Sequence, residues 1–402
     1  MSDTVTLPAI RSRPWIARRT SAPVGRLDSI QYLRAVAVLM VAFYHLTVLF
    51  REPHAARWAI PGPLYFGYAG VDLFFLISGF IIAYVVRSDF VDVRVFALKR
   101  MFRILPLYWL VTTVILIMSL LSPAHIAIRA NSFGRFLLDS YLLLPTPERP
   151  LLGVGWTLQH EFQFYALVAL LLLLGGKRFL VPALLAIFAA AVVLRVFVDP
   201  RAELFWDWKL LSLYSFEFAL GVICYQINTS WEIRGGWVLI MIGIIGFIGT
   251  SAVITPLMGH EREVSVVAKG PFGLGRCVGF GLASFAILIG TLNLRFKDSE
   301  GFRGIRRGLL EIGNASFVIY LTHNLVIQLI ATVSRKLPQT TPFIIAFILA
   351  TVLMIATVGI VIHRRLEKPM LQFFETWVIP RIAGRELAKT PSQPRVALKD
   401  EF

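Results

Sequence analysis

Long apolar stretches alternate with short polar ones along most of the chain. A helix needs about 20 apolar residues to cross the hydrocarbon core of a bilayer. Stretches of this length predict ten membrane-spanning helices, over residues 30–50, 66–86, 101–121, 156–174, 179–198, 209–226, 237–256, 273–293, 311–332 and 342–362. The pattern therefore predicts an all-α, polytopic membrane protein.

The polar segments predict how this protein is divided and oriented. Residues 1–29 predict a basic N-terminal tail, residues 30–365 a membrane domain, and residues 366–402 an interfacial helix followed by a polar tail. An even number of spans places both tails on one side of the membrane. Lys and Arg are concentrated in the tails and in loops on their side, such as residues 294–310, so both tails are predicted to be cytoplasmic.

Composition supports the membrane assignment and argues against other classes of protein. Charged residues make up 16% of the chain, whereas a soluble domain is about one quarter charged. The net charge of +16 is explained by cytoplasmic anchoring, so no nucleic-acid partner is expected. Both cysteines, Cys224 and Cys277, lie in predicted spans, which favours neither a disulfide framework nor a metal site.

The first predicted span carries two ionisable side chains, Arg34 and His45. A charge near the bilayer centre costs about 2.5–3.5 kcal/mol on insertion scales. Their spacing corresponds to three helical turns plus about 20°, so both lie on one helix face, about 16 Å apart along the axis. Separately, Arg34 can snorkel to the interface and His45 can be a buried structural imidazole. Together they predict a functional cavity.

Two further spans place polar side chains at related depths. GVDLFFLISGF puts Asp72 in the outer third of the second span and Ser78 near mid-depth, beside Gly79. Plain helix packing is the alternative explanation for the Ser-Gly pair. ASFVIYLTHN adds Tyr320 and His323 to the ninth span.

The fourth span begins WTLQHEFQFY, with Glu161 at about the depth of His45. A carboxylate there needs a proton, a cation or an imidazole as partner, and His45 and His160 are both candidates. A structural ion pair is the alternative. Trp156 and Tyr165, on the same helix, are expected to line the cavity.

The third span begins KRMFRILPLYW, with Lys99, Arg100 and Arg103 at its inner end. Arg100 and Arg103 share a helix face. These residues are explained singly as topological anchors. Combined with Arg34, they predict a cytoplasmic pocket for phosphate oxygens, which Arg binds through forked hydrogen bonds.

The polar residues therefore change character from the inner to the outer end of the bundle. Cations lie at the inner mouth, a hydroxyl in the middle, and imidazole and carboxylate groups beyond it. This order suits a phosphate-bearing donor with an arm of about 15–20 Å, such as coenzyme A, and a general base that removes a hydroxyl proton. A transporter or flippase for a lipid-linked glycan or small ions would also contain buried Arg, His and Glu. The lack of evident repeats favours the enzyme.

Five segments together resemble the acyltransferase family 3 membrane proteins, and within them the bacterial exopolysaccharide acetyltransferases. They are IQYLRAVAVLMVAFYHL, GVDLFFLISGF, KRMFRILPLYW, WTLQHEFQFY and ASFVIYLTH, spread over residues 30–324. The resemblance implies transfer of an acyl group, usually acetyl from acetyl-CoA, to a hydroxyl of an exopolysaccharide, lipopolysaccharide or other envelope glycan. It also implies a multi-pass protein of the bacterial inner membrane, with lipids, acyl-CoA and a glycan or lipid-linked sugar as partners. Succinyl-CoA or another acyl-CoA remains an alternative donor.

The resemblance also assigns roles to individual positions. Arg34 and His45 occupy the Arg-x10-His positions that are regarded as essential in the family. Ser78 matches its Ser-Gly motif, and Arg100 and Arg103 its basic motif in the third span. Glu161 falls in an element similar to Trp-x4-Glu, where this chain reads WTLQHE and so adds His160 as a second candidate imidazole.

Overall fold

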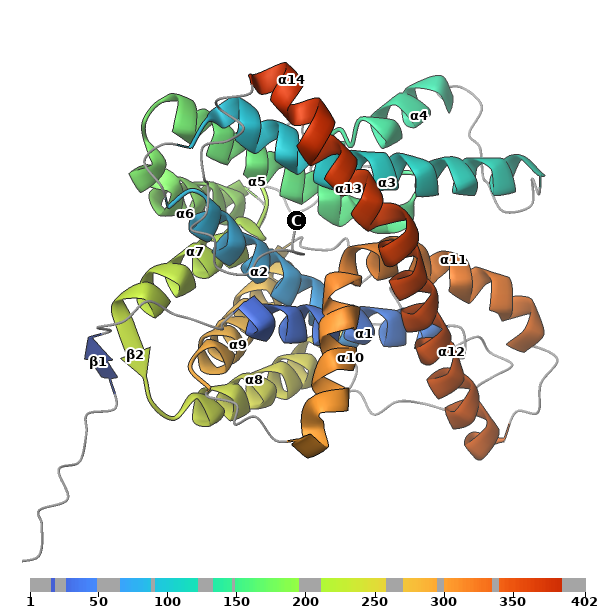
Figure 1. Ribbon diagram of the computed structural model, residues 1–402. Helices are drawn as coiled ribbons and strands as arrows, with labels where there is room; N and C mark the ends of the chain where they lie inside the picture. The colour runs from blue at the N-terminus through green and yellow to red at the C-terminus, as the bar shows by residue number, and fades with distance from the viewer. Residues whose placement is uncertain are drawn as a thin grey trace, which may run out of the picture.

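The computed structural model describes residues 16–18, 27–48, 66–87, 91–121, 133–146, 149–194, 211–257, 270–294, 300–334 and 340–384. Within these residues the chain is almost entirely helical (Figure 1). The α-helices are α1 (Leu27–Val48), α2 (Gly70–Val85), α3 (Val93–Leu121), α4 (Phe133–Tyr141), α5 (Trp156–Leu173), α6 (Leu180–Val192), α7 (Ser215–Ser230), α8 (Gly236–Leu257), α9 (Gly270–Leu292), α10 (Arg303–Asn314), α11 (Ser316–Ser334), α12 (Thr341–Ile362), α13 (Lys368–Phe373) and α14 (Ile379–Ala383). Short 3₁₀ turns precede α2, α5, α6 and α10, namely η2 (Phe66–Ala69), η5 (Gly153–Gly155), η6 (Lys177–Phe179) and η9 (Glu300–Phe302).

A helix lies at each of the ten predicted spans, but the helices differ in length. Six helical stretches of the described residues are long and apolar enough to cross a membrane: Asp28–Thr47, Phe66–Val85, Val93–Leu121, Gly236–Ile254, Gly273–Leu292 and Pro342–Ala383. The other four predicted spans correspond to the shorter α5, α6, α7 and α11. The structure agrees with an all-α membrane protein, whereas ten crossings and two cytoplasmic termini stay predictions. Residues 195–210, most of residues 1–29 and the tail after residue 384 lie outside the described residues.

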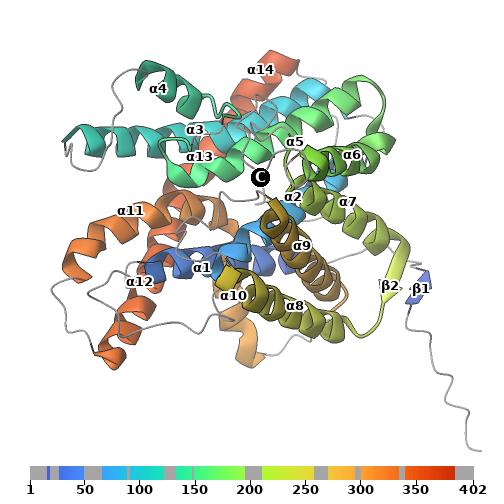
Figure 2. The same cartoon turned by 180° about the vertical axis from the view of Figure 1, so that it is seen from behind.

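Helix α1 lies at the centre of the helical assembly (Figures 1 and 2). It packs against α2, α9, α10, α11 and α12. Its small side chains permit this, because Ala37 and Ala42 are fully buried and Gly70 of α2 lies directly against the Ala37 carbonyl. The central position brings side chains on α1 into contact with several helices at once.

Helices α2 and α7 cross through two glycines. A Cβ atom at Gly79 would lie 2.3 Å from the Phe218 carbonyl oxygen, and one at Gly221 would lie 2.1 Å from the Leu76 carbonyl oxygen. Both distances are far shorter than a van der Waals contact, so any larger residue would separate the helices. Helix packing, the alternative explanation of the Ser-Gly pair, therefore accounts for Gly79, and this contact fixes the part of α2 that carries Ser78.

The C-terminal helices form one helical run from Thr341 to Ala383, which crosses in front of α3 in Figure 1. Two π-helical turns interrupt it, η10 (His363–Glu367) and η11 (Phe374–Val378). Each turn is followed within two residues by a proline, which cannot donate the next helical hydrogen bond. Phe374 stacks on Phe102 of α3 with ring centroids 4.2 Å apart. The predicted boundary at residue 365 falls inside this run.

A small antiparallel sheet is present that the hydrophobic pattern does not predict. Strand β1 (Ile16–Arg18) lies within the predicted N-terminal tail, and β2 (Trp231–Ile233) follows α7. Ile16 pairs with Ile233, and Arg18 pairs with Trp231. The sheet ties the N-terminal segment to the end of α7.

Candidate active site

The described residues form a cavity bounded by α1, α2, α3, α5, α11 and the C-terminal helical run. Its empty volume, including the part open to solvent, is about 1570 Å³. Eight of the side chains predicted for the site line it: Arg34, Ser78, Lys99, Arg100, Arg103, Glu161, Tyr165 and Tyr320. The structure thus brings together residues from five predicted spans.

Four of these residues are basic and are called the basic cluster: Arg34, Lys99, Arg100 and Arg103. Two carboxylates of the C-terminal run lie close to them, one in the cavity lining and one behind it. Glu375 lines the cavity and interacts electrostatically with the three cluster residues on α3. Glu367 interacts in the same way with Arg103 and Arg34. These shared partners place the guanidinium of α1 near those of α3.

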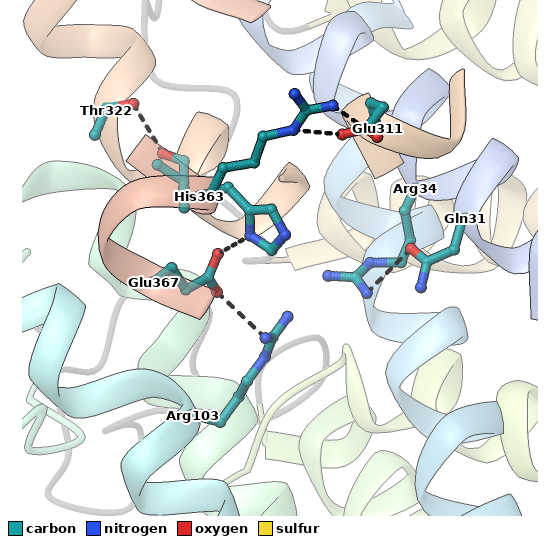
Figure 3. Close-up of polar contacts among 9 residues, drawn as sticks. Gln31, Arg34, Arg103, Glu311, Thr322, His363 and Glu367 are labelled. Carbon is teal, nitrogen blue, oxygen red and sulfur yellow. Dashed lines mark hydrogen bonds and ion pairs between the residues drawn. The ribbon is translucent and has the colours of Figure 1, made fainter. Parts of the chain in front are cut away.

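The guanidinium groups of Arg34 and Arg103 point into one space (Figure 3). Arg34 donates from Nη1 to Gln31 Oε1 at 3.4 Å. Arg103 Nη1 lies 3.2 Å from Glu367 Oε1. The predicted convergence of these side chains from α1 and α3 is present in the structure, and its role in phosphate binding is considered below.

Glu161 has hydroxyl partners in place of the predicted imidazole. Ser78 Oγ donates to Glu161 Oε1 at 3.1 Å, and the Tyr165 hydroxyl donates to the same oxygen. The Arg100 guanidinium carbon lies 5.8 Å from the centroid of the Tyr165 ring. Glu161 therefore lies beside the basic cluster rather than at the far end of the polar path.

Tyr320 lies at the wall of the cavity and is hydrogen-bonded there through its hydroxyl. Its hydroxyl donates to the Val154 carbonyl at 3.2 Å and accepts a hydrogen bond from Thr157 Oγ1 at 3.0 Å. On its other side, its ring centroid lies 5.8 Å from that of His323. Tyr320 thus separates the cavity from the histidines beyond it.

His45 and His323 form a pair outside the lining of the cavity. Their Nδ1 and Nε2 atoms, respectively, are 3.2 Å apart. His323 Nδ1 lies 3.2 Å from the Ile319 carbonyl, so in a neutral ring it carries the proton and leaves Nε2 as acceptor. His45 Nδ1 then donates to that Nε2 and to the Val41 carbonyl at 3.0 Å. The assigned tautomer leaves His45 Nε2 unprotonated, as a general base requires.

The prediction of one open cavity joining Arg34 to His45 is wrong for the described residues. The two residues do share a face of α1, but Ala37, Val38 and Val41 between them are almost completely buried. Gly70 of α2 packs directly against this segment. Close helix packing therefore fills the space that periodicity alone leaves open.

Trp156 and His160 lie in an aromatic cluster instead of the cavity lining. His160 packs edge-on against Tyr214 and Trp156, with ring centroids 5.2 and 5.8 Å away. Phe75 of α2 completes the cluster. Because consecutive helical residues point about 100° apart, His160 and Glu161 face different neighbours.

Asp72 is also placed away from the cavity lining. Its Oδ2 lies 2.7 Å from Arg276 Nη2, and both side chains are at most 1% exposed. Arg276 also donates to the Tyr214 hydroxyl, and Glu217 is fully buried in the same region. The expectation of a substrate-facing Asp72 is corrected to a buried ion pair between α2 and α9.

Arg276, Glu217 and Glu367 were not predicted from the sequence. The available signal was a charged residue within or directly after an apolar stretch. Within the described part of the chain, no group of three or more His, Cys, Asp or Glu side chains is placed to hold a metal ion.

Comparison with known proteins assigns the family. The family model described as an acyltransferase domain, that of acyltransferase family 3, matches residues 27–363, which contain the basic cluster, Glu161 and His45. This chain belongs to acyltransferase family 3. The family assignment favours an enzyme over the transporter alternative.

Two relatives are named for related activities. The chain is 29% identical over 318 residues to the exopolysaccharide production protein ExoZ of Rhizobium meliloti (strain 1021), covering 76% of this chain and 90% of that protein. It is 29% identical over 332 residues to the acyltransferase MdmB of Streptomyces mycarofaciens, covering 76% and 80%. No solved structure matches the chain. Together with the apolar helices, these findings identify a membrane acyltransferase.

Proposed function

We propose that this acyltransferase moves an acyl group, acetyl in the simplest case, from cytoplasmic acyl-CoA to a hydroxyl of an exopolysaccharide, a lipopolysaccharide or another envelope glycan. It would act as a multi-pass protein of the bacterial inner membrane. The similarity to an exopolysaccharide production protein supports a glycan acceptor. The observation that carries the proposal is one cavity lined by the basic cluster together with Ser78 and Glu161.

The basic cluster suits the phosphate groups of coenzyme A. The donor carries a diphosphate and a further phosphate on its ribose. Guanidinium groups bind phosphate through forked hydrogen bonds, and three of the four cluster residues are arginines. Convergence of Arg34 from α1 with Arg100 and Arg103 from α3 allows contact with more than one phosphate.

Acyl transfer requires a base near the thioester. The acceptor hydroxyl oxygen attacks the thioester carbonyl, its proton passes to the base, and a carbon–oxygen bond replaces the carbon–sulfur bond. The coenzyme A thiolate leaves and takes up a proton. A positioned general base typically contributes about 10²–10⁴-fold to such a step.

His45 is the stronger candidate for this base. It lies about 16 Å from Arg34 along the axis of α1, a separation that a pantetheine arm of about 15–20 Å spans by running past Tyr320 rather than along the packed face of α1. Its assigned tautomer presents an unprotonated Nε2. Glu161 lies nearer the basic cluster, through Tyr165 and Arg100, and is placed to contact the arm of the donor.

Tyr320 lies between the proposed donor site and the histidine pair, so it affects how the donor reaches the acceptor. Tyr320 lines the cavity on one side and contacts His323 on the other. Direct transfer to a hydroxyl at His45 therefore requires Tyr320 to turn aside when the donor binds. We infer that the acceptor approaches His45 from the side opposite the donor, because His45 itself is only half-buried.

Transfer of radiolabel in membrane vesicles tests the proposal. Inside-out vesicles that contain the acceptor glycan are supplied with acetyl-CoA labelled in the acetyl group, and the glycan is isolated and counted. We expect labelled glycan with the wild-type protein and at least a 10²-fold lower rate for His45→Ala, since the base is lost. Unlabelled succinyl-CoA added as competitor identifies the preferred acyl group.

The same assay separates donor binding from chemistry. Arg34→Lys should raise KM for acetyl-CoA about tenfold with little change in kcat, because a point charge replaces the forked guanidinium. Normal transfer by His45→Ala, or an unchanged KM for Arg34→Lys, would contradict the respective assignment. Absence of label on glycan with wild-type protein would contradict the proposed reaction.

A further inference from the structure

Glu367 is a fully buried carboxylate directly behind the basic cluster. Its Oε1 lies 3.2 Å from Arg103 Nη1, and its Oε2 lies 2.6 Å from His363 Nδ1. Its side chain is 0% exposed, whereas that of Arg103 is 22% exposed. Figure 3 shows the carboxylate between His363 and Arg103, with Arg34 pointing toward the same space. Burying a charge is costly, and membrane anchoring does not explain a carboxylate that is buried here.

The local backbone is unusual at this residue. Glu367 ends the π-helical turn η10, and Pro369 follows it. Proline lacks the N–H that would bond to the carbonyl four residues earlier, which favours the wider turn. Such turns are rare and occur frequently at functional sites. Here the turn presents His363 and Glu367 together toward α3.

We propose that Glu367 is a positioning residue for the donor site, holding the Arg103 guanidinium in the orientation that binds a phosphate of acyl-CoA. His363 holds the second carboxylate oxygen, so the contacts among these three side chains connect the C-terminal helical run to the cavity. This inference rests on the proposed function, because it assumes that the basic cluster binds the donor. It assigns the segment after residue 362 a part in donor binding.

The position of Glu367 indicates that it orients Arg103 and does not compete with a phosphate for the cavity. Glu367 is not among the described residues that line the cavity, whereas Arg103 is. It occupies one terminal nitrogen of Arg103, and a guanidinium has five N–H donors. An arginine side chain has several freely rotating bonds, and a fixed carboxylate restricts them before the donor arrives. Glu375, by contrast, does line the cavity and would compete with a bound anion.

Binding of coenzyme A to the full-length protein in lipid nanodiscs tests this inference. Isothermal titration calorimetry gives Kd for wild type, Glu367→Gln, Arg103→Ala and the double variant. We expect Glu367→Gln to weaken binding about tenfold, and Glu367→Asp, which keeps the charge, to restore most of it. Because Glu367 acts through Arg103, the double variant should bind no more weakly than Arg103→Ala alone.

The control variant is Glu311→Gln, which breaks an exposed ion pair with Arg364, a residue next to His363. It should leave Kd unchanged. If Glu367→Gln does not fold, His363→Gln keeps the pair with Arg103 and should weaken binding about threefold. Wild-type affinity in both Glu367→Gln and His363→Gln, tighter binding in Glu367→Gln, or additive losses in the double variant would overturn the inference. No binding of coenzyme A by the wild type would instead overturn the proposed donor.

Discussion

Arg276 is a buried charged side chain whose partners are all close to it. It pairs with Asp72 at 2.7 Å and its guanidinium carbon lies 5.3 Å from the centre of the Tyr214 ring. Removing one partner of a buried ion pair leaves an uncompensated charge, which typically costs about 3–5 kcal/mol. The pair therefore links the stability of α2 to that of α9.

Arg276→Met is expected to lower the thermal stability of the protein markedly. The change leaves Asp72 without its cation and close to the second buried carboxylate, Glu217. The measurement is the temperature at which the monodisperse peak in size-exclusion chromatography is lost. Arg364→Gln, which breaks an exposed pair, should leave that temperature unchanged. If both variants lose the peak at the same temperature, the buried ion pair contributes no more to stability than the exposed one.

Residue types were predictable from the sequence more often than their partners. The ionisable and hydroxyl side chains that line the cavity were mostly identified, since charge inside an apolar stretch is a strong signal. Partners were not, because Asp72 and Arg276 are 204 residues apart, and Ser78 and Glu161 are 83 apart. Helical periodicity says nothing about which distant helix faces which.

At the scale of the elements, helix α2 depends on glycine to reach its place beside α7. The Cβ of an alanine at position 79 would lie 2.3 Å from the Phe218 carbonyl oxygen. The backbones would have to separate, and overpacking of this kind typically costs about 1–3 kcal/mol. Movement of α2 would also displace Ser78 from Glu161, which lie 3.1 Å apart.

Gly79→Ala is therefore expected to lower both thermal stability and acyl transfer. Gly249→Ala on α8 is the matched control, because its Cβ would meet nothing within 4 Å. Thermal unfolding and the vesicle assay are measured for both variants. If Gly79→Ala unfolds at the wild-type temperature, the close crossing of α2 and α7 is not a structural requirement.

The positions of the helices along the chain were largely predictable. How the helices pack against one another, and how the last helix continues after residue 365, were not. The apolar stretches identify where helices lie because the length of a span is set by the bilayer. The eleven-residue spacing correctly places Arg34 and His45 on one face of α1, but Gly70 fills the path between them. The segment after residue 365 has an amphipathic pattern, which predicts an interfacial helix. Its buried Glu367 and its contact with Phe102 emerge only from the fold.

For the whole molecule, the structure separates two groups of polar residues that the sequence pattern placed along one polar path. The basic cluster and Glu161 share a cavity bounded by the C-terminal helical run, and the pair of His45 and His323 lies behind Tyr320. Under the proposed function, this arrangement places the donor site and the base on opposite sides of Tyr320.

The position of bound coenzyme A tests this account most directly. A cryo-electron microscopy reconstruction of the full-length protein in nanodiscs, prepared with an excess of coenzyme A, would locate the phosphate groups and the thiol. We predict phosphate density within hydrogen-bond distance of Arg34 and Arg103, with the thiol directed toward Tyr320 and His45. Coenzyme A bound elsewhere, with the basic cluster unoccupied, would contradict the account.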